Sequence, residues 1–338
     1  MNETNEEKIN CQLLNLSNQN VLNCLEYIAF DSNSTIVLAI QQQIINCYFF
    51  KNNYLKHMSS IKVLKDEVGY LNQLEYLKTS NSILTIYQQR ILIANLNGFN
   101  TRKFLLKNRL KLQGRCGSLL FNKIQSHLFI SNQNQICFFE KRMDGWKCSQ
   151  EIEVDYSRVS VISMCLNCQE DELLVQTNNG YTGSTKVYIY HKKTQQQEIK
   201  WIQIQSMWQG IIFGKLWGGF VDHFYLINEF ALNVYNKSNQ SQDYIHYASS
   251  EFKHSQSLIF KQILQNNLVL LIKNQSISVM KLNQQQKLEQ IKQIKIDLSA
   301  LNNLNHGYSS KQSLLTQDEK LLVIWNRQDT LIIEMIYI

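Results

Sequence analysis

The sequence predicts an all-β chain made of seven repeats, each built from four antiparallel strands. Three observations support this fold class. Paired apolar runs recur at a regular period along the 338 residues. A further apolar segment precedes most pairs, and an alternating segment follows most of them. A spare apolar segment near the N-terminus matches a strand that the last repeat lacks.

Each pair consists of two short apolar runs separated by a few residues, mostly Asn and Gln. The first runs begin near Ile36, Ile83, Leu128, Leu173, Phe224, Leu268 and Leu321. The second runs begin near Ile44, Ile91, Ile136, Val187, Leu232, Ile277 and Leu331. Both sets keep a period of about 45 residues. Short runs rich in Ile, Val, Leu, Phe and Tyr and bounded by turn residues indicate buried strands, so each pair is predicted to be a β-hairpin.

Two more strands are predicted around most hairpins. The preceding apolar segments are 24–30, 118–122, 161–166, 210–216 and 257–261. The following alternating segments are 60–64, 104–112, 146–154, 200–206 and 291–297. Four strands in about 45 residues form one blade of a β-propeller. We therefore expect a single propeller domain over 1–338, with repeats at approximately 19–65, 66–113, 114–155, 156–209, 210–254, 255–303 and 304–338.

This period and strand pattern resemble the WD40 repeat group over nearly the whole chain, which implies a seven-bladed propeller of four-stranded antiparallel blades. The Gly-His and Trp-Asp signatures of that group are missing. The second runs end instead in pairs such as Phe49-Phe50, Phe138-Phe139, Ile189-Tyr190 and Val234-Tyr235. The chain thus resembles a divergent member, in which apolar packing between sheets carries more of the stability. Kelch-like and other propellers remain open alternatives.

The two ends of the chain predict how the ring closes. The seventh repeat stops at Ile338 after its third strand, whereas residues 9–16 (INCQLLNL) form an apolar segment ahead of the first repeat. We expect Ile9 to Leu16 to pair with the strand from Leu331 to Ile338, which covers an edge that would otherwise promote aggregation.

One segment admits two interpretations. Residues 282–304 could form an amphipathic helix, with Leu288, Ile291 and Leu298 near one face. The surrounding period favours a strand beginning at Ile291, and a strand is our prediction.

The composition limits the possible partners and the location. The 34 basic and 27 acidic residues give a net charge of +7. The basic residues are scattered, without the dense Lys and Arg stripe and stacking aromatics of nucleic-acid binders. No apolar run is long enough to span a membrane, and the polar N-terminus lacks the pattern of a secretory signal. We therefore expect a cytoplasmic protein that needs no homo-oligomer and binds neither nucleic acid nor the membrane interior.

The chain contains no proline, so its turns must be made by Asn, Gly, Asp and Ser.

The residue types that perform catalysis or bind metals are present but not arranged for it. Cys165 and Cys168 form a C-x-x-C without a second pair, and within a strand they would face opposite sides of the sheet. Core packing of Cys165 and an exposed Cys168 thiol are expected. The seven histidines lack metal-binding spacing, and the sequence has no nucleophile motif or phosphate loop. We expect no enzyme, metal or cofactor.

A propeller presents many loops on a rigid frame, so the sequence predicts a protein-interaction scaffold or an adaptor subunit of a larger intracellular complex. This step is an analogy, because propellers also host enzymes and small-ligand binders that use the central channel, which is the alternative. Trp217 is the candidate protein-binding residue, since Trp dominates interface energetics. Arg115 and Arg158, in the loops leading into the third and fourth repeats, are expected on the same face.

Overall fold

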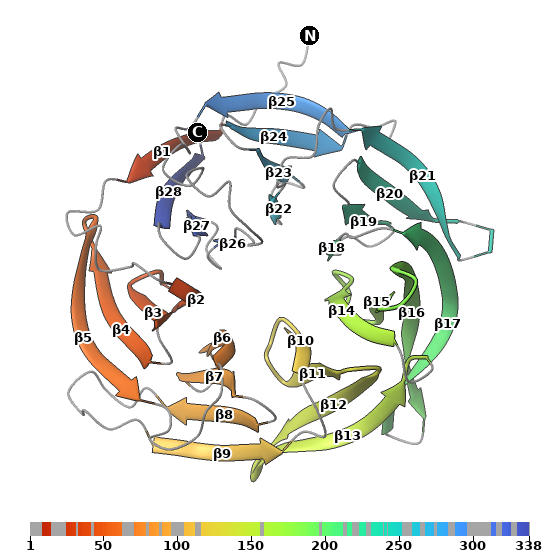
Figure 1. The fold of residues 1–338 in the computed structure, drawn as a ribbon, viewed down its shortest axis with the longest axis horizontal. Coiled ribbons are helices and arrows are strands. Elements are labelled where there is room, and N and C mark those ends of the chain that lie inside the picture. Colours follow the sequence, from red (N-terminus) through yellow and green to blue (C-terminus); the bar gives the residue numbers. More distant parts are fainter. Residues whose placement is uncertain are drawn as a thin grey trace. The chain divides into compact units, whose positions relative to one another are not determined.

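A computed structural model of the chain describes 23 stretches of residues. They are 9–14, 25–31, 33–41, 44–62, 71–78, 81–87, 90–95, 105–111, 116–155, 159–195, 198–211, 215–217, 223–227, 231–238, 240–241, 243–251, 259–263, 268–273, 276–282, 288–295, 312–315, 320–325 and 330–337. These residues form seven four-stranded antiparallel sheets (Figure 1). In six of them, four strands consecutive in the sequence also lie in consecutive order in the sheet.

We number the sheets by repeat. Sheet 1 contains β2 (Leu25–Phe30), β3 (Ile36–Gln41), β4 (Ile44–Lys51) and β5 (Tyr54–Lys62). Sheet 2 contains β6 (Leu71–Leu77), β7 (Ser82–Tyr87), β8 (Arg90–Asn95) and β9 (Leu105–Lys111). Sheet 6 contains β22 (Ile259–Ile263), β23 (Leu268–Lys273), β24 (Ser276–Leu282) and β25 (Leu288–Lys295). Sheet 7 contains β26 (Gln312–Leu315), β27 (Leu321–Trp325), β28 (Thr330–Tyr337) and β1 (Ile9–Leu14).

The remaining three sheets come from the middle of the chain. Sheet 3 contains β10 (Cys116–Phe121), β11 (His127–Asn132), β12 (Gln135–Arg142) and β13 (Gly145–Glu153). Sheet 4 contains β14 (Val159–Leu166), β15 (Glu172–Asn179), β16 (Ser184–Gln195) and β17 (Glu198–Ile211). Sheet 5 contains β18 (Lys215–Trp217), β19 (His223–Ile227), β20 (Ala231–Lys237) and β21 (Tyr244–Glu251).

The sheets belong to two compact units. The first comprises Met1–Tyr87, Leu92–Lys107 and Gln256–Ile338, and the second comprises Gln88–Ile91 and Asn108–Ser255. Sheets 3, 4 and 5 lie in the second unit, where the site described below is found. The expectation of one domain over 1–338 stays a prediction.

The strands follow the predicted pattern, with differences at several ends. β5 begins at Tyr54, well before the predicted segment 60–64, because Asn52 and Asn53 adopt left-handed conformations and join β4 directly to β5. β17 extends to Ile211, so the first two residues of the predicted segment 210–216 belong to sheet 4 instead of sheet 5. The ambiguous segment after residue 282 contains β25, a strand as predicted, which begins at Leu288.

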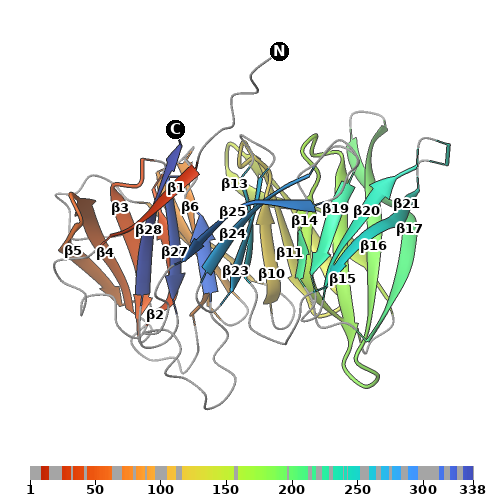
Figure 2. The same ribbon diagram turned by 90° about the horizontal axis from the view of Figure 1, so that it is seen from above.

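The N-terminal strand pairs with the C-terminal strand. β1 runs antiparallel to β28, with Ile9 opposite Tyr337 and Leu14 opposite Ile332 (Figure 2). Leu14 is buried among residues of sheets 7 and 1. The predicted pairing is confirmed for these residues, and the last two residues of the predicted strand lie outside the described part of the chain.

Apolar side chains fill the spaces between neighbouring sheets. One cluster joins sheet 7 to sheet 1 and another joins sheet 1 to sheet 2. In the second unit, Phe129, Phe138 and Trp201 pack between sheets 3 and 4. Cys165 and Phe224 pack between sheets 4 and 5. The described part of the chain contains no helix long and apolar enough to cross a membrane.

The hairpin between the first and second strands has one geometry in sheets 1, 3 and 4. An Asp or Asn side chain accepts hydrogen bonds from the backbone N–H groups of the fourth and fifth residues after it, and so caps the turn between the two strands. The three sets are Asp31 with Thr35 and Ile36, Asn122 with Ser126 and His127, and Asn167 with Asp171 and Glu172.

The third residue after that Asp or Asn has a positive φ in each of these hairpins. These residues are Ser34, Gln125 and Glu170. The prediction of Asn-rich turns is correct at Asn52, Asn53 and Asn81, but Gln and Glu also occupy left-handed positions. At Gln125 and Glu170 the side-chain caps from Asn122 and Asn167 stabilise this backbone conformation.

Candidate functional site

The structure does not test the predicted interaction residues. Trp217 ends β18, but its side chain lies outside the described part of the structure. Arg115 and Arg158 also lie outside the described residues. The candidate site therefore rests on other residues, at the junction of sheets 4 and 5.

Glu172 is the charged residue at the centre of this junction. The Asn167 cap fixes its backbone, because the Asn167 side chain accepts a hydrogen bond from the Glu172 N–H at 3.1 Å. Glu172 then begins β15, and its side chain is only 1% exposed. The same hairpin position holds Ile36 in sheet 1 and His127 in sheet 3, so the turn itself does not require an acidic residue.

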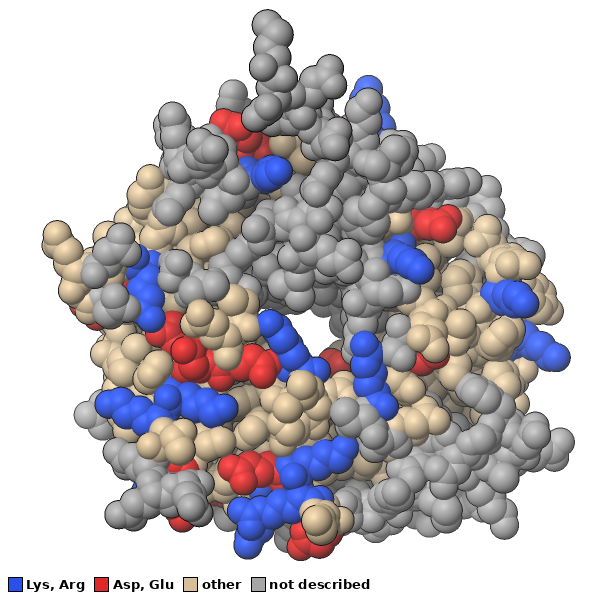
Figure 3. Space-filling model, turned by 180° about the vertical axis from the view of Figure 1, so that it is seen from behind, with Lys and Arg blue, Asp and Glu red and all other residues tan. Residues whose placement is uncertain are grey.

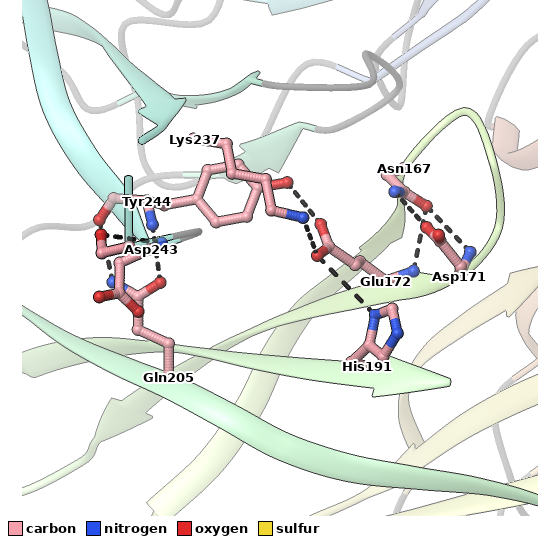
Figure 4. Close-up of polar contacts among 9 residues, drawn as sticks. Asn167, Asp171, Glu172, His191, Gln205, Lys237, Asp243 and Tyr244 are labelled. Atoms are coloured by element: carbon pink, nitrogen blue, oxygen red, sulfur yellow. Dashed lines mark hydrogen bonds and ion pairs between the residues drawn. The ribbon is translucent and has the colours of Figure 1, made fainter. Parts of the chain in front are cut away.

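The Glu172 carboxylate is held by groups from sheets 4 and 5 (Figure 4). Lys237, at the end of β20, lies with its Nζ 2.6 Å from Oε1. The Tyr244 hydroxyl donates to Oε2 at 2.6 Å. His191 of β16 places its Nδ1 3.9 Å from Oε1. The buried carboxylate thus has partners on both oxygens, which offsets the cost of removing it from water.

This arrangement is suited to holding two sheets together. Both Glu172 oxygens are engaged and the side chain is buried, so its bonding capacity is directed at Lys237 and Tyr244. A charge-assisted hydrogen bond of this kind is stronger than a neutral one and is sensitive to geometry. We conclude that Glu172 fixes the position of β20 and β21 against sheet 4.

Tyr244 is held to sheet 4 at a second point. The Gln205 side chain on β17 donates from Nε2 to the Tyr244 carbonyl at 2.9 Å and accepts from the Tyr244 N–H at 2.8 Å. The Tyr244 ring also contacts the Phe224 ring, with centroids 5.2 Å apart. Hydrogen bonds to the backbone and hydroxyl and packing of the ring therefore hold this residue in one orientation.

The junction of sheets 3 and 4 repeats the backbone contact. Gln150 on β13 donates from Nε2 to the Trp201 carbonyl and accepts from the Trp201 N–H. Trp201 is buried and stacks with Phe138 at a centroid distance of 5.9 Å. A carboxylate–tyrosine contact recurs as well, since the Tyr188 hydroxyl donates to the half-buried Asp155. Both junctions thus combine a Gln side chain that bonds to a backbone with a carboxylate that accepts a hydrogen bond from a Tyr hydroxyl.

Known proteins of similar structure show which fold class this architecture belongs to. No family model and no curated protein sequence matches the chain. Several solved structures are similar in fold. A protein from Lactobacillus plantarum has a TM-score of 0.61 at 6% identity, with 80% of this chain and 85% of that chain covered. A candidate 6-phosphogluconolactonase from Bacteroides fragilis has a TM-score of 0.60 at 11% identity, with 88% and 97% covered.

A periplasmic gluconolactonase from Pseudomonas aeruginosa gives a TM-score of 0.58 at 8% identity, with 80% of this chain and 85% of that chain covered. The chain is a β-propeller. At these identities the likeness concerns the fold alone, and it does not single out the WD40 group.

The fourth strand of a blade contains a β-bulge at a recurring position. The register shifts opposite five residue pairs, which are Cys47/Tyr48, Phe138/Phe139, Ile189/Tyr190, Val234/Tyr235 and Val279/Met280. The extra residues of the fourth strands are Met58, Ser149, Ile204, Tyr247 and Ile291. These bulges lie at or beside the ends of the second apolar runs of the sequence.

The bulge allows one strand to contribute core side chains to the junctions on both sides of its sheet. Side chains alternate between the two faces of a strand, and one extra residue reverses the alternation. In β17, Trp201 packs against sheet 3 before the bulge, whereas Met207 packs against sheet 5 after it. Gln205, the residue after the bulge, can therefore reach Tyr244 in the next blade.

The same bulges accompany exposed apolar side chains. Ile204 is 45% exposed and Tyr247 is 48% exposed. Ile202 and Ile245 on the same two strands are 36% and 54% exposed. The pair Ile202 and Ile204 lies on β17 and the pair Ile245 and Tyr247 on β21, the fourth strands of two neighbouring sheets of one unit. We call Ile202, Ile204, Ile245 and Tyr247 the apolar row.

The apolar row is uncharged, unlike other fourth strands. Residues 201–211 of β17 and 244–250 of β21 contain no Asp, Glu, Lys or Arg. Charged residues occur along the fourth strands of sheets 1, 3 and 6, including Lys56, Lys147, Glu151, Glu289 and Lys292. Natural sheets protect their edges with such charges, which on these two strands are confined to the ends, at Glu198, Lys200 and Glu251.

On the face drawn in Figure 3, the described charged side chains form no basic patch that would attract a polyanion. Lys and Arg lie interspersed with Asp and Glu wherever the described surface carries charge. Within the described residues, no three His, Cys, Asp or Glu side chains cluster as metal ligands. Cys165 is buried in the core as predicted, and Cys168 lies in a turn and is half-buried, less exposed than expected.

Sequence reasoning missed Glu172, Gln205 and Gln150. Glu172 lies in the acidic stretch QEDE, which has the appearance of a solvated turn. The glutamines are hidden in a chain where Asn and Gln make up about a fifth of the residues. One usable signal exists, because a Trp precedes a Gln by four residues at both Trp146 and Trp201.

Proposed function

We propose that this β-propeller is a non-catalytic interaction scaffold in a larger intracellular complex, with seven blades closed into a ring by β1 as in WD40-like propellers. The paired β1 and β28 and the seven four-stranded sheets support the ring. The partner is proposed to be another protein, since the mixed charges of Figure 3 do not favour nucleic acid.

The apolar row carries this proposal. Surface hydrophobic residues scattered singly are ordinary, whereas two exposed apolar pairs on the fourth strands of neighbouring sheets are a feature that a protein interface would use. Glu172 and Gln205 fix β21 against sheet 4, so the row is held in one arrangement before a partner arrives. A preorganised surface loses less entropy on binding.

A cytoplasmic location is part of the proposal. Cys47, Cys137 and Cys165 are free thiols buried in separate sheets. Free buried cysteines are typical of proteins from reducing compartments.

The decisive experiment is affinity purification of the tagged protein from its native cells at physiological salt, with quantified stoichiometry. We expect at least one protein at a fixed molar ratio, and we expect the purified pair to reassemble in solution. Recovery of the propeller alone, as a folded monomer in repeated preparations, would reject the scaffold.

Lactone hydrolysis is the second candidate function. Two of the similar structures carry lactonase names, and His191 here combines a 36% exposed side chain with a buried carboxylate 3.9 Å away. A histidine oriented by a carboxylate is a common acid–base arrangement. The test is hydrolysis of 6-phosphogluconolactone and gluconolactone by the purified protein, with His191→Ala as the control. Turnover that is lost in this variant would favour the enzyme over the scaffold.

A further inference from the structure

We infer that the junction of sheets 4 and 5 binds internal water on the side-chain amide of Gln176, including one molecule that links this amide to Asn178. Both residues belong to β15, the strand that begins with Glu172. This water site goes beyond the proposed scaffold function and does not depend on it. Two observations carry the inference: the burial of the Gln176 amide without a partner, and the uncharged side chains around it.

The Gln176 side chain faces the junction of sheets 4 and 5. The pairing of β15 with β16 is regular from Glu172 to Asn178, so alternate residues of β15 share one face. On that face Glu172 bonds to Lys237 of sheet 5, and Leu174 packs in the apolar cluster shared with sheet 5. Gln176 and Asn178 are the next two residues on the same face.

The Gln176 amide is buried and has no hydrogen-bond partner among the described residues. The residue is 0% exposed, and neither its Nε2 nor its Oε1 is hydrogen-bonded. Within the same described stretch, the Oδ1 atom of Asn178 is also buried and unpaired. Withdrawing such groups from water is unfavourable, and buried polar groups are almost always bonded to protein or to ordered water. These three atoms therefore need partners that the neighbouring side chains do not supply.

The corresponding position in two other blades does not leave a polar group unpaired. Counting four residues on from the fifth residue after each hairpin cap gives Ile40 in sheet 1 and Ser131 in sheet 3. Ile40 is fully buried and apolar, whereas the Ser131 hydroxyl accepts a hydrogen bond from the Ser118 N–H at 2.6 Å. The amide of Gln176 is thus neither required by the fold nor paired within its own sheet, which favours a small internal ligand as its partner.

Water fits the burial and the chemistry of this place. A fully buried amide is reached by neither bulk solvent nor a partner protein. The residues opposite Gln176 and Asn178 on β16 are Val187 and Thr185, which are buried and uncharged, so an ion bound here would lose its hydration without gaining an ion pair. An internal water typically makes about three hydrogen bonds and can both donate and accept. One amide N–H₂ group and two carbonyl oxygens match these requirements.

The spacing of the two amides allows one water to bridge them. Residues two apart on a strand lie about 6.6 Å apart along it. A water that bonds to two polar atoms at about 2.8 Å each spans up to about 5.6 Å between them. The extra methylene of Gln lets its amide approach Asn178 over the remaining distance. One water can thus accept from the Gln176 Nε2 and donate to the Asn178 Oδ1, while a second donates to the Gln176 Oε1.

A crystal structure of the full chain at about 2 Å resolution or better tests the inference directly. We expect electron density for a water within about 3.2 Å of both the Gln176 amide and the Asn178 Oδ1. Oxygen-17 magnetic relaxation dispersion then counts the long-lived internal waters in solution. Gln176→Met keeps the length of the side chain without its amide and is expected to hold about one or two fewer such waters. Ile40→Met, at the corresponding position of sheet 1, is the matched control and should leave the count unchanged.

Circular dichroism checks that both variants fold. If Gln176→Met does not fold, Asn178→Ala is measured instead, which removes the partner of the bridging water alone. Equal counts of internal waters in the original protein and in the folded variant would overturn the inference. So would a Gln176 amide that bonds to another part of the chain, or density for a molecule larger than water. The scaffold function is tested separately, by the recovery of a stoichiometric partner.

Discussion

Gln150 of β13 and Trp201 of β17, 51 residues apart in the sequence, are joined by two hydrogen bonds between one side-chain amide and one backbone. Gln205 and Tyr244 form the same pair one blade later. The primary amide of Gln suits this role because it offers a donor and an acceptor on one planar group. Blade-to-blade contact in the second unit therefore combines directional hydrogen bonds with apolar packing.

Removing the Gln205 amide is expected to loosen sheet 5 from sheet 4. Gln205→Ala deletes both hydrogen bonds to buried Tyr244 and leaves its backbone groups without this partner, at a cost of about 1–3 kcal/mol. Amide hydrogen exchange of β21 measures the effect locally, and faster exchange is expected. Gln203→Ala is the matched control, because Gln203 is an exposed residue of the same strand. Equal exchange in the two variants would contradict the role of Gln205.

Breaking the buried ion pair is expected to be costlier than breaking an exposed one. Glu172→Ala leaves Lys237 and the Tyr244 hydroxyl without their carboxylate, which costs about 3 kcal/mol for a buried pair. Glu198→Gln removes an exposed pair with Lys200 at 3.8 Å and should cost below about 1 kcal/mol. Urea unfolding of the three proteins gives the comparison. A loss at Glu172 no larger than that at Glu198 would show that the junction does not depend on this carboxylate.

His127 makes the stability of sheet 3 sensitive to acid. Burial, together with the nearby Lys192 charge, lowers the pKa of this histidine in the folded chain, although Glu140 and Glu170 oppose the shift. The unfolded chain therefore binds a proton first as the pH falls below about 6.5, and folding loses stability from that point downwards. Well above its unfolded-state pKa of about 6.5 the histidine is neutral in both states and contributes no pH dependence.

Urea unfolding of the original protein and of His127→Gln checks this sign. The difference between the two free energies of unfolding should be constant from pH 7 to 8. It should change in favour of the variant between pH 6.5 and 5. A difference that changes in favour of histidine on acidification would contradict the lowered pKa.

A chain that begins at residue 19 is expected to associate or to lose stability. The deletion removes β1, exposes the backbone of β28 and uncovers core residues packed against Leu14. Sedimentation velocity and thermal unfolding measure both effects. Unchanged monomer content and an unchanged melting temperature would show that β1 is dispensable.

The strands were predictable from the sequence because their signal is local. Buried strands such as β3 and β27 are nearly continuous apolar runs, and polar residues bound them on both sides. The period then gave the grouping into blades, and the spare segment at Ile9 gave the pairing with β28. Strand ends were less predictable, as at β5, because a turn of two left-handed Asn residues has no distinctive flanking pattern.

The junction was not predictable, because its geometry depends on which face a side chain occupies. Trp201 and Gln205 are four residues apart and would share one face of a regular strand, yet the bulge at Ile204 directs them to opposite neighbours. No residue type marks a bulge in this chain, where Met58, Ser149 and Ile204 all occupy the extra position. The partners of Glu172 come from two different blades, a relation that only the three-dimensional structure supplies.

In the hairpins capped by Asp31, Asn122 and Asn167, the path of the backbone does not depend on which side chain the fifth residue after the cap carries. Their hydrogen bonds use the main chain of the fifth residue and ignore the side chain, which is Ile36 in one blade, His127 in another and Glu172 in a third. A mutation at this fifth position can thus replace a hydrophobic residue with a base or an acid while the loop keeps its backbone conformation. The neighbouring blade sets the limit instead, since Ile36 packs in the core between sheets 1 and 2 and Glu172 bonds to Lys237 and Tyr244 of sheet 5.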